Sequence, residues 1–526
     1  MSEIKSHVID GSPAHGSDRK TSIPFGPGSG AAGSAALCAS VVVLCVWLGE
    51  GGEHRRAVAV SLLLAGLIAS VELMGMGRGR ERRIVMRRSA SRVRMRALIL
   101  LGILMAGITG MTRSSAEWSA VDAVRLGTYR GEATVVGDSK EIGRGRRVIL
   151  EIDGQRFESW LFGSKRHRAN RLESGDVVAV EGVRTGFTGD QARRSQIRHV
   201  LGRFELSEMA SVIDGHQRSA PLVRAANRVR GMIRKGADLL DVEHGALFTG
   251  LVYGDDSSQP PEMVEDFRAS GLAHLTAVSG QNVVFVLAMA GPLLARMRRS
   301  WRIGCTLVLL VWFAIMTRLE PSVIRAVFMA GTSALMAGVG GPVSSWVALC
   351  LTVGVASLID PFLVWSVGWW LSVAGCAGLI VATPPIGRLF DRFPTWVSSW
   401  ISPTIAAQTG VLGVIVGVFG WPSAMSIPCN LLAAPVAGLV MLIGLPFAIV
   451  GGLLPTGLGH AVMWPIGWGV AWVEGVASLG ARIDPPTAVD MAVSLTLAGF
   501  TGWAVVRFRL TREDFTDGVS PDRSPL

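Results

Sequence analysis

The chain has 526 residues, of which 49% are apolar and only 17% are charged, and its mean hydropathy is +0.42. A soluble domain carries about 25% charged residues, so this composition excludes an ordinary soluble protein. The net charge of +11 comes almost entirely from arginine. In a membrane protein such an excess first indicates loops on the cytoplasmic side, and only secondarily nucleic-acid binding.

Residues 1–30 are polar and rich in glycine, proline and serine, which predicts a disordered tail and no cleavable signal peptide. Apolar runs within residues 31–111 predict three transmembrane helices. The loop at residues 78–96 is rich in arginine, and short loops of this kind stay in the cytoplasm. The N-terminus is therefore expected inside, and the segment after residue 111 outside.

Residues 117–212 differ in character from the rest of the chain. Polar and apolar residues alternate with period two, and turn signals such as Asp153-Gly154 separate the runs. About five short strands in this space predict a small extracytoplasmic β-barrel, and an OB-like fold is one candidate.

Basic residues on the expected loops of this barrel alternate with aromatic residues. That combination is typical of proteins that bind single-stranded nucleic acid without sequence preference. The candidates are Arg144, Arg146, Arg147, Lys165, Arg166, Arg168, Arg193, Arg194 and Trp160. The alternative is a barrel core of aromatic residues with a solvated basic rim.

Residues 221–270 predict amphipathic helices, and the first is basic, so it could lie on the membrane surface or line the approach of a polyanion. Residues 271–506 predict a second membrane domain, with a cytoplasmic tail at 507–526. About twelve crossings in all, with both termini in the cytoplasm, agree with the strongly basic loops. Glycines and prolines in 421–455 could break a helix there. The expected fold class is a polytopic α-helical protein of the plasma membrane with a small outer barrel.

The cysteines give no sign of a disulfide framework or a zinc site, so we expect neither a metal nor a cofactor. All six lie in or beside apolar runs: Cys38, Cys45, Cys305, Cys350, Cys376 and Cys429.

Several polar residues lie inside the apolar runs of the second membrane domain, where such groups are costly unless they face water or a partner. They are His274, Ser279, Gln281, Asn282, Arg325, Gln408 and Asn430. Two explanations are open: these residues line a hydrophilic path, or they form hydrogen bonds that hold the helices together.

One continuous helix through this stretch would place His274 and Ser279 about 140° apart. That spacing disfavours a Ser–His nucleophile pair and hence an intramembrane hydrolase. Arg325 needs a counter-charge in the bilayer, and Glu474 is the clear intramembrane carboxylate, so an ion pair between them is one expectation. The other is that Arg325 faces an aqueous path and meets passing phosphates.

Four motifs follow one another along the chain, downstream of the acidic dipeptide Gly254-Asp255. They are Gly271-Leu272-Ala273-His274-Leu275 with Ala277-Val278-Ser279-Gly280, Pro321-Ser322 with Arg325-Ala326, Ser366 with Leu371-Ser372, and Pro428 with Asn430-Leu431-Leu432 and Pro435. In this order, over roughly residues 117–480, the chain resembles the ComEC-type competence proteins. That family forms the inner-membrane DNA channel of natural transformation.

The resemblance implies that single-stranded DNA passes through the membrane domain after the barrel has received it outside. It also implies partners: the lipid bilayer, an outer DNA receptor, a cytoplasmic ATPase or helicase, a separate nuclease, and further copies of the chain. Many relatives carry a C-terminal metallo-β-lactamase-like domain. This sequence has no His-x-His-x-Asp-His cluster and stops soon after its last apolar run, so we expect no enzyme activity. Gln281-Asn282 also stand where many members have Leu-His.

Two other classes of function stay open. A secondary transporter of a small polar solute would use the same membrane helices, with Arg325 and Glu474 as a coupling pair. A membrane scaffold would use the barrel to bind a partner. The sequence shows no nucleotide-binding motif, so any motor is expected to be a partner protein.

Overall fold

The computed structural model describes residues 30–48, 105–119, 123–143, 145–163, 172–212, 220–339, 343–483 and 485–517. The predicted N-terminal tail up to residue 29, most of the predicted N-terminal membrane segment and the end of the chain from residue 518 lie outside these ranges.

The described chain is mostly helical, with one barrel of five strands. Its helices are α1 Gly30–Leu48, α5 Gly189–Gln196, α6 Pro221–Ala237, α7 Val242–Tyr253, α8 Pro261–Ala269, α9 Ala273–Thr276, α10 Gly280–Ala295, α11 Arg299–Met316, α12 Pro321–Val339, α13 Ser345–Ile359, the 3₁₀ helix η4 Pro361–Trp365, α14 Val367–Leu389, α15 Thr395–Val418, α16 Ser426–Leu453, α17 Thr456–Arg482 and α18 Thr487–Asp517. Residues 105–119 form a further helix before the barrel.

The five strands close into a barrel in the order β1-β2-β3-β5-β4. They are β1 Gly127–Ile142, β2 Gly145–Ile152, β3 Gln155–Leu161, β4 Val177–Gly186 and β5 Gly202–Val212. Strands β3 and β5 are parallel, and the other neighbours are antiparallel. The predicted turn at Asp153-Gly154 is confirmed: both residues have positive φ, 53° and 75°, as a two-residue hairpin turn requires.

Alternation along the strands separates a core from an outer surface. In β3, Phe157, Ser159 and Leu161 are buried while their neighbours are less so. Phe157 and Phe204 fill the barrel core, whereas Phe162, just past β3, is 58% exposed. The aromatic residues of the barrel are therefore divided between its core and its surface.

Five helices of the described chain are long and apolar enough to cross a membrane: Arg299–Met316, Val367–Leu389, Val397–Val418, Ser426–Leu453 and Thr487–Thr511. Three shorter apolar helices accompany them, Ala35–Trp47, Gly280–Ala295 and Ser345–Ile359. The described part of the chain thus has the helices of a membrane protein. The twelve crossings and their sidedness stay predictions.

The break that glycines and prolines could cause within residues 421–455 does not occur in the helix that forms there. Helix α16 is continuous for 28 residues and includes both Pro435 and Pro446. Neighbouring helices let a membrane helix tolerate proline in this way, because packing offsets the lost hydrogen bonds. Here α17 runs beside α16 and α6 crosses it so closely that a methyl group at Gly236 would lie 2.3 Å from the Ala448 carbonyl oxygen.

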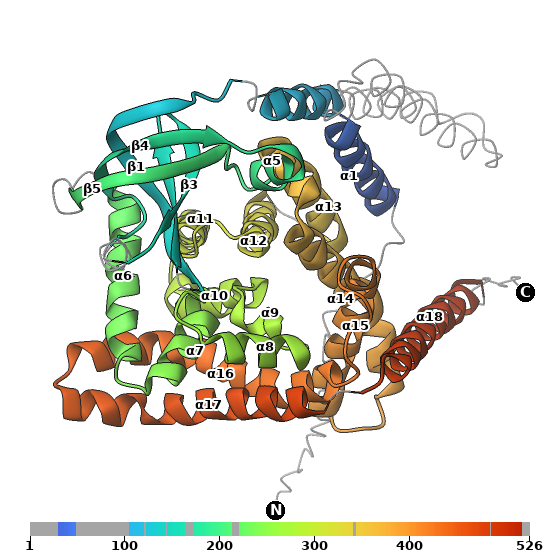
Figure 1. Cartoon of the computed structure of the whole chain (residues 1–526). Helices are drawn as coiled ribbons and strands as arrows, with labels where there is room; N and C mark the ends of the chain where they lie inside the picture. The colour runs from blue at the N-terminus through green and yellow to red at the C-terminus, as the bar shows by residue number, and fades with distance from the viewer. Residues whose placement is uncertain are drawn as a thin grey trace, which may run out of the picture.

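The barrel and the α16–α17 hairpin lie on opposite sides of the molecule (Figure 1). Helix α6 runs between the two along one edge, and α5 brings the barrel over α13 at the other. We call everything from α6 to α18 the helical body. The barrel therefore bridges two sides of this body.

Candidate functional site

The polar stretch that begins the second membrane domain is not one continuous helix. α9 ends at Thr276, Ala277 is extended, and α10 begins at Gly280. Ser279 is the N-cap of α10, and its Oγ accepts a hydrogen bond from the Gln281 backbone N–H at 3.2 Å. Serine favours that position because it satisfies a free N–H of the first turn. The predicted angle between His274 and Ser279 therefore does not apply.

Asn282 is a structural residue. It is 3% exposed, and its Nδ2 donates to the carbonyl oxygens of Leu251 and Val252 at 2.9 and 3.1 Å. Its Oδ1 accepts from Ser279 Oγ at 3.1 Å. Because the two carbonyls belong to the last turn of α7, Asn282 fixes the end of α7 to the start of α10.

Arg325 and Glu474 do not form the predicted ion pair. Glu474 Oε2 lies 3.1 Å from His244 Nε2, because α7 and α8, and not α12, pack against this part of α17. Arg325 Nε donates to Ser372 Oγ at 2.6 Å, and its guanidinium also contacts the sulfur atoms of Cys376 and Met329. The coupling pair that the transporter hypothesis needs is absent from this arrangement.

Arg325 is 7% exposed, and no carboxylate of the described chain lies within ion-pair distance of it. Its guanidinium faces the start of α10: a methyl group at Gly280 would lie 2.6 Å from Nη2. Ser322, one turn earlier, donates to the Val278 carbonyl oxygen. The first turn of α12 thus holds a buried cation beside the positive end of the α10 dipole, and two positive groups at one place favour an anion bound next to both.

The other predicted path residues lie on α9, α10, α15 and α16. His274 of α9 is exposed, with Nδ1 3.2 Å from the Gly271 carbonyl oxygen, and it interacts with the Asn430 side chain of α16. Gln281 is exposed at the start of α10. Gln408 Nε2 donates to Ser426 Oγ at 3.0 Å, which ties α15 to α16.

A close contact packs the turn before α9 onto the start of α16. Gly271 has φ 75°, and a methyl group there would lie 2.4 Å from Ser426 Cβ. We call His274, Gln281, Arg325 and Asn430, together with the start of α10, the junction cluster. Of the predicted path residues, Asn282 is buried, and Gln408 is bonded to Ser426 at the start of α16.

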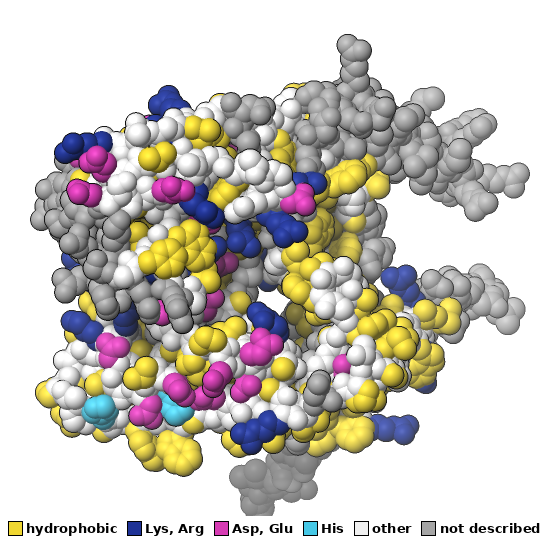
Figure 2. Space-filling view, viewed as in Figure 1, with side chains coloured by type: hydrophobic (Ala, Val, Ile, Leu, Met, Phe, Trp, Pro, Cys, Tyr) yellow, Lys and Arg dark blue, Asp and Glu magenta, His cyan; other side chains and the backbone are white. Residues whose placement is uncertain are grey.

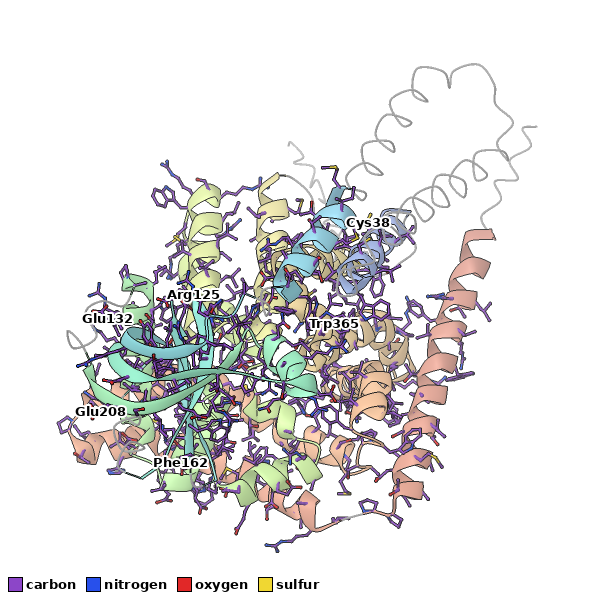
Figure 3. The ribbon with its side chains drawn as sticks, turned by 45° about the horizontal axis from the view of Figure 1, so that its top comes forward. Cys38, Arg125, Glu132, Phe162, Glu208 and Trp365 are labelled. Carbon is purple, nitrogen blue, oxygen red and sulfur yellow. The ribbon has the colours of Figure 1, made fainter. Side chains whose placement is uncertain are left out.

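The basic residues predicted for the barrel have different surroundings. Arg146 donates to Ser139 Oγ at 2.8 Å, Arg147 stands opposite Trp160 across β2 and β3, and Arg194 is exposed on α5. Arg193 lies over the Trp118 and Trp365 rings at 5.8 and 5.2 Å, so it docks α5 on η4, beside Trp365 (Figure 3). The remaining four predictions, Arg144, Lys165, Arg166 and Arg168, lie outside the described residues.

A polar cavity of about 430 Å³ between the barrel and the body was not predicted. It is lined by Asp138, Ser139, Arg146, Leu172, Glu173, Asn227, Arg230, Arg234, Asp255, Ser257, Ser258 and Arg318. The basic face of α6 was predicted, but the carboxylates that it meets in this cavity were not. The available signal was Gly137-Asp138, since a glycine within a strand suggests a bulge. The register of β1 does shift there, and Gly137 has φ 74°.

Two carboxylates bind three of the arginines that line this cavity. Asp138 accepts hydrogen bonds from Arg230 and Arg318, and Asp255 accepts from Arg234 at 3.1 Å. Burial raises the pKa of Asp255, but Arg230, Ser257 and Arg234 together outweigh it and hold this pKa below its usual value. Burial, and then Asp255, raise the pKa of the neighbouring Tyr253 to about 12.

Lysine and arginine side chains border the hollow between the barrel, the α16–α17 hairpin and helices α13 to α15 in Figure 2. The barrel is also held to the body on both sides. Lys140 Nζ lies 2.9 Å from Asp256, near the cavity, and His199 Nε2 lies 3.1 Å from Asp360 Oδ2, near α13.

A family model described as "Competence protein" matches residues 251–510. The chain is 28% identical to ComE operon protein 3 of Bacillus subtilis over 349 residues, which cover 64% of this chain and 43% of that protein. It is 29% identical to competence protein ComA of Neisseria gonorrhoeae over 155 residues, or 28% of this chain and 22% of that one. An uncharacterized Escherichia coli protein, YcaI, is 26% identical over 269 residues, 48% of this chain and 33% of that protein.

The chain therefore spans less than half the length of each of these relatives. No solved structure matches it.

Proposed function

Because the chain belongs to the ComEC-type family of competence proteins, we propose that it is a membrane channel component that passes single-stranded DNA into the cytoplasm during natural transformation. The family match lies in the helical body and includes the whole junction cluster. The substrate, the direction of transport and the plasma-membrane location with both termini inside are parts of this proposal.

The observation that carries the proposal is Arg325. A buried arginine without a counter-charge costs several kcal/mol, and a fold keeps one only where something offsets that cost. The N–H groups at the start of α10 cannot do so, because they are also positive. A phosphate of a passing strand would satisfy both at once, and exposed His274 and Gln281 would offer it further hydrogen bonds.

The barrel supports the same proposal. Its five-stranded closed order, with β3 parallel to β5, suits an OB-like fold, and such folds bind single strands on basic, aromatic surfaces. Arg147 beside Trp160 and exposed Phe162 offer charge and stacking area of this kind. In this proposal the barrel receives the strand outside the membrane from an outer DNA receptor.

The helical body then guides the strand, and a cytoplasmic ATPase or helicase draws it inward. The chain itself catalyses no reaction, and a separate nuclease removes the second strand. Further copies of the chain could complete the channel.

The test is an Arg325→Gln variant in a transformation assay. Removing a buried charge from a charged partner costs about 2–5 kcal/mol, so transformation should fall by roughly 30-fold or more. Size-exclusion profiles of the tagged protein should stay unchanged. The matched control is Arg302→Gln, an exposed arginine of α11, which should transform normally.

Normal transformation by Arg325→Gln with full protein levels would overturn the proposal. So would loss of folded protein in both Arg325→Gln and Arg325→Lys, since Arg325 would then be a structural residue.

A further inference from the structure

Two arginines of the helical body form hydrogen-bonded ion pairs with Asp138 of the barrel. Arg318 Nε and Nη2 both donate to Asp138 Oδ1, at 3.1 and 2.8 Å, and Arg230 Nη2 donates to Oδ2. Both oxygens of the carboxylate are therefore held, one of them by two donors of a single guanidinium. Guanidinium groups bind carboxylates and phosphates alike, because both anions present charged oxygen acceptors to the same N–H donors.

The two arginines are positioned by the body itself and not by Asp138. Arg230 Nη1 donates to the Met316 carbonyl oxygen at 2.8 Å, and its guanidinium lies over the Tyr253 ring at 4.4 Å. Arg318 Nη2 donates to Asn227 Oδ1 at 2.9 Å. Both side chains are well buried, at 4% and 14% exposed, and Arg230 Nη2 also lies 3.5 Å from Asp255 Oδ2 of the body. The body therefore holds the two arginines as a rigid pair.

The backbone conformation at Arg318 also indicates a binding site. Arg318 and Leu319 both have positive φ, 59° and 57°, which is uncommon for side chains of this size. The Leu319 N–H donates to the Ala314 carbonyl oxygen at 2.8 Å and holds this turn in place. Backbone conformations of this kind cluster at binding and active sites.

Asp138, by contrast, comes from the bulge in β1, and its side chain is 25% exposed. The polar cavity of about 430 Å³ adjoins it and leaves room for a larger anion. Arg318 also stands in the turn that leads directly into α12, the helix that carries Arg325. The arginine pair and the junction cluster thus lie at the same end of one helix.

We propose that Arg230 and Arg318 form a phosphate-binding subsite of the DNA path, and that Asp138 of the barrel occupies it when no strand is bound. An incoming strand exchanges its phosphate for the Asp138 carboxylate, so that its binding releases this contact between barrel and body. The inference rests on the proposed function and specifies how the strand enters. It assigns Asp138 the role of an internal competitor of DNA.

The test measures binding of a fluorescent oligo(dT) to the full chain in lipid nanodiscs over a range of salt concentrations. Asp138→Asn keeps the shape of the side chain and removes its charge, so affinity should rise by roughly tenfold, or 1.4 kcal/mol. The slope of log K against log salt should steepen by about 0.7 for each additional phosphate that the variant binds.

Asp256→Asn is the matched control. It breaks a separate ion pair between the barrel and the body, with Lys140, but frees neither Arg230 nor Arg318. Its affinity and salt slope should equal those of the unmodified chain. Adding Arg318→Gln to Asp138→Asn should remove the increase in affinity.

Equal increases in Asp138→Asn and Asp256→Asn would overturn the inference, because loosening of the barrel would then explain both. An unchanged Asp138→Asn beside a binding parent chain would also overturn it and leave the proposed function standing. If the parent chain and all variants fail to bind oligo(dT), the proposed function fails together with the inference.

Discussion

His199 of the barrel is bound to Asp360 of the helical body, with Nε2 3.1 Å from Oδ2 and the imidazole edge against the Phe362 ring at 5.1 Å between centroids. Arg193 reinforces this contact by stacking over Trp365. The contact lies on the far side of the barrel from Asp138. The barrel therefore spans the body between two anchors of different chemistry, a histidine–carboxylate and ring contact at η4 and an arginine cluster at α6.

The His199 anchor predicts a local effect on barrel dynamics. His199 has φ 58°, so His199→Asn keeps a residue that tolerates this backbone while removing the contact with Asp360. A hydrogen bond of this kind contributes about 0.5–1.5 kcal/mol, so amide exchange in α5 and η4 should speed up by roughly tenfold. Hydrogen-exchange mass spectrometry measures this, and the strands of the barrel should keep their protection. Arg198→Asn, at the exposed neighbouring position, is the control.

Gly271 predicts a stability effect at the junction cluster. Gly271→Ala places a methyl group 2.4 Å from Ser426 Cβ at φ 75°, which should cost about 1–3 kcal/mol. Gly231→Ala in α6 is the matched control. No atom lies within 4 Å of its new methyl group, so it should gain about 0.5–1 kcal/mol instead. Thermal unfolding of the two variants in detergent should shift in opposite directions, and a shift in the same direction would contradict this account of the α9–α16 contact.

Asn282 predicts a fold defect rather than a transport defect. Asn282→Leu leaves the Leu251 and Val252 carbonyl oxygens without their donor in a buried place, which should cost about 1–3 kcal/mol. Gln281→Leu, at the exposed adjacent position, should keep stability within about 0.5 kcal/mol. Folded yield and unfolding temperature decide the matter. A stable Asn282→Leu protein that fails in transformation would contradict this prediction and place Asn282 among the residues that line the DNA path.

The sequence predicted those features that local chemistry determines. Alternation along residues 117–212 and the Asp153-Gly154 turn predicted a small barrel because a pleated strand and a tight hairpin impose their own patterns. The apolar runs predicted membrane helices for the same reason. The sequence also carried a signal for the break before Gly280, because Ser279 is a favourable N-cap. One continuous helix was predicted instead because a long apolar run follows.

Partner choice could not be predicted in this way. An ion pair between Arg325 and Glu474 was one of two expectations, because Glu474 is the clear carboxylate in an apolar run, yet Glu474 contacts His244 of α7 instead. Asp138 and Arg318 are 180 residues apart, and only the docking of the barrel brings them together. Long-range ion pairs depend on how whole elements pack, which neither spacing nor composition records.

Tyr253 predicts how stability responds to high pH. It lies in α7, outside the candidate membrane spans, and burial raises its pKa to about 12, against about 10 for a free tyrosine. In the unfolded chain Tyr253 loses its proton first, so the stability that it contributes is intact below pH of about 10 and is lost as the pH rises toward 12. Tyr253→Phe should lessen this loss.

The measurement is direct because the chain has only two tyrosines. In a Tyr129→Phe background, ultraviolet absorbance reports the ionisation of Tyr253 alone. The phenol should titrate well above pH 10 in the folded protein and near 10 after denaturation. A folded-state titration near 10 would mean that water reaches Tyr253. The end of α7, and with it the Arg230 side chain stacked on this ring, would then not be sealed as the rigid arginine pair requires.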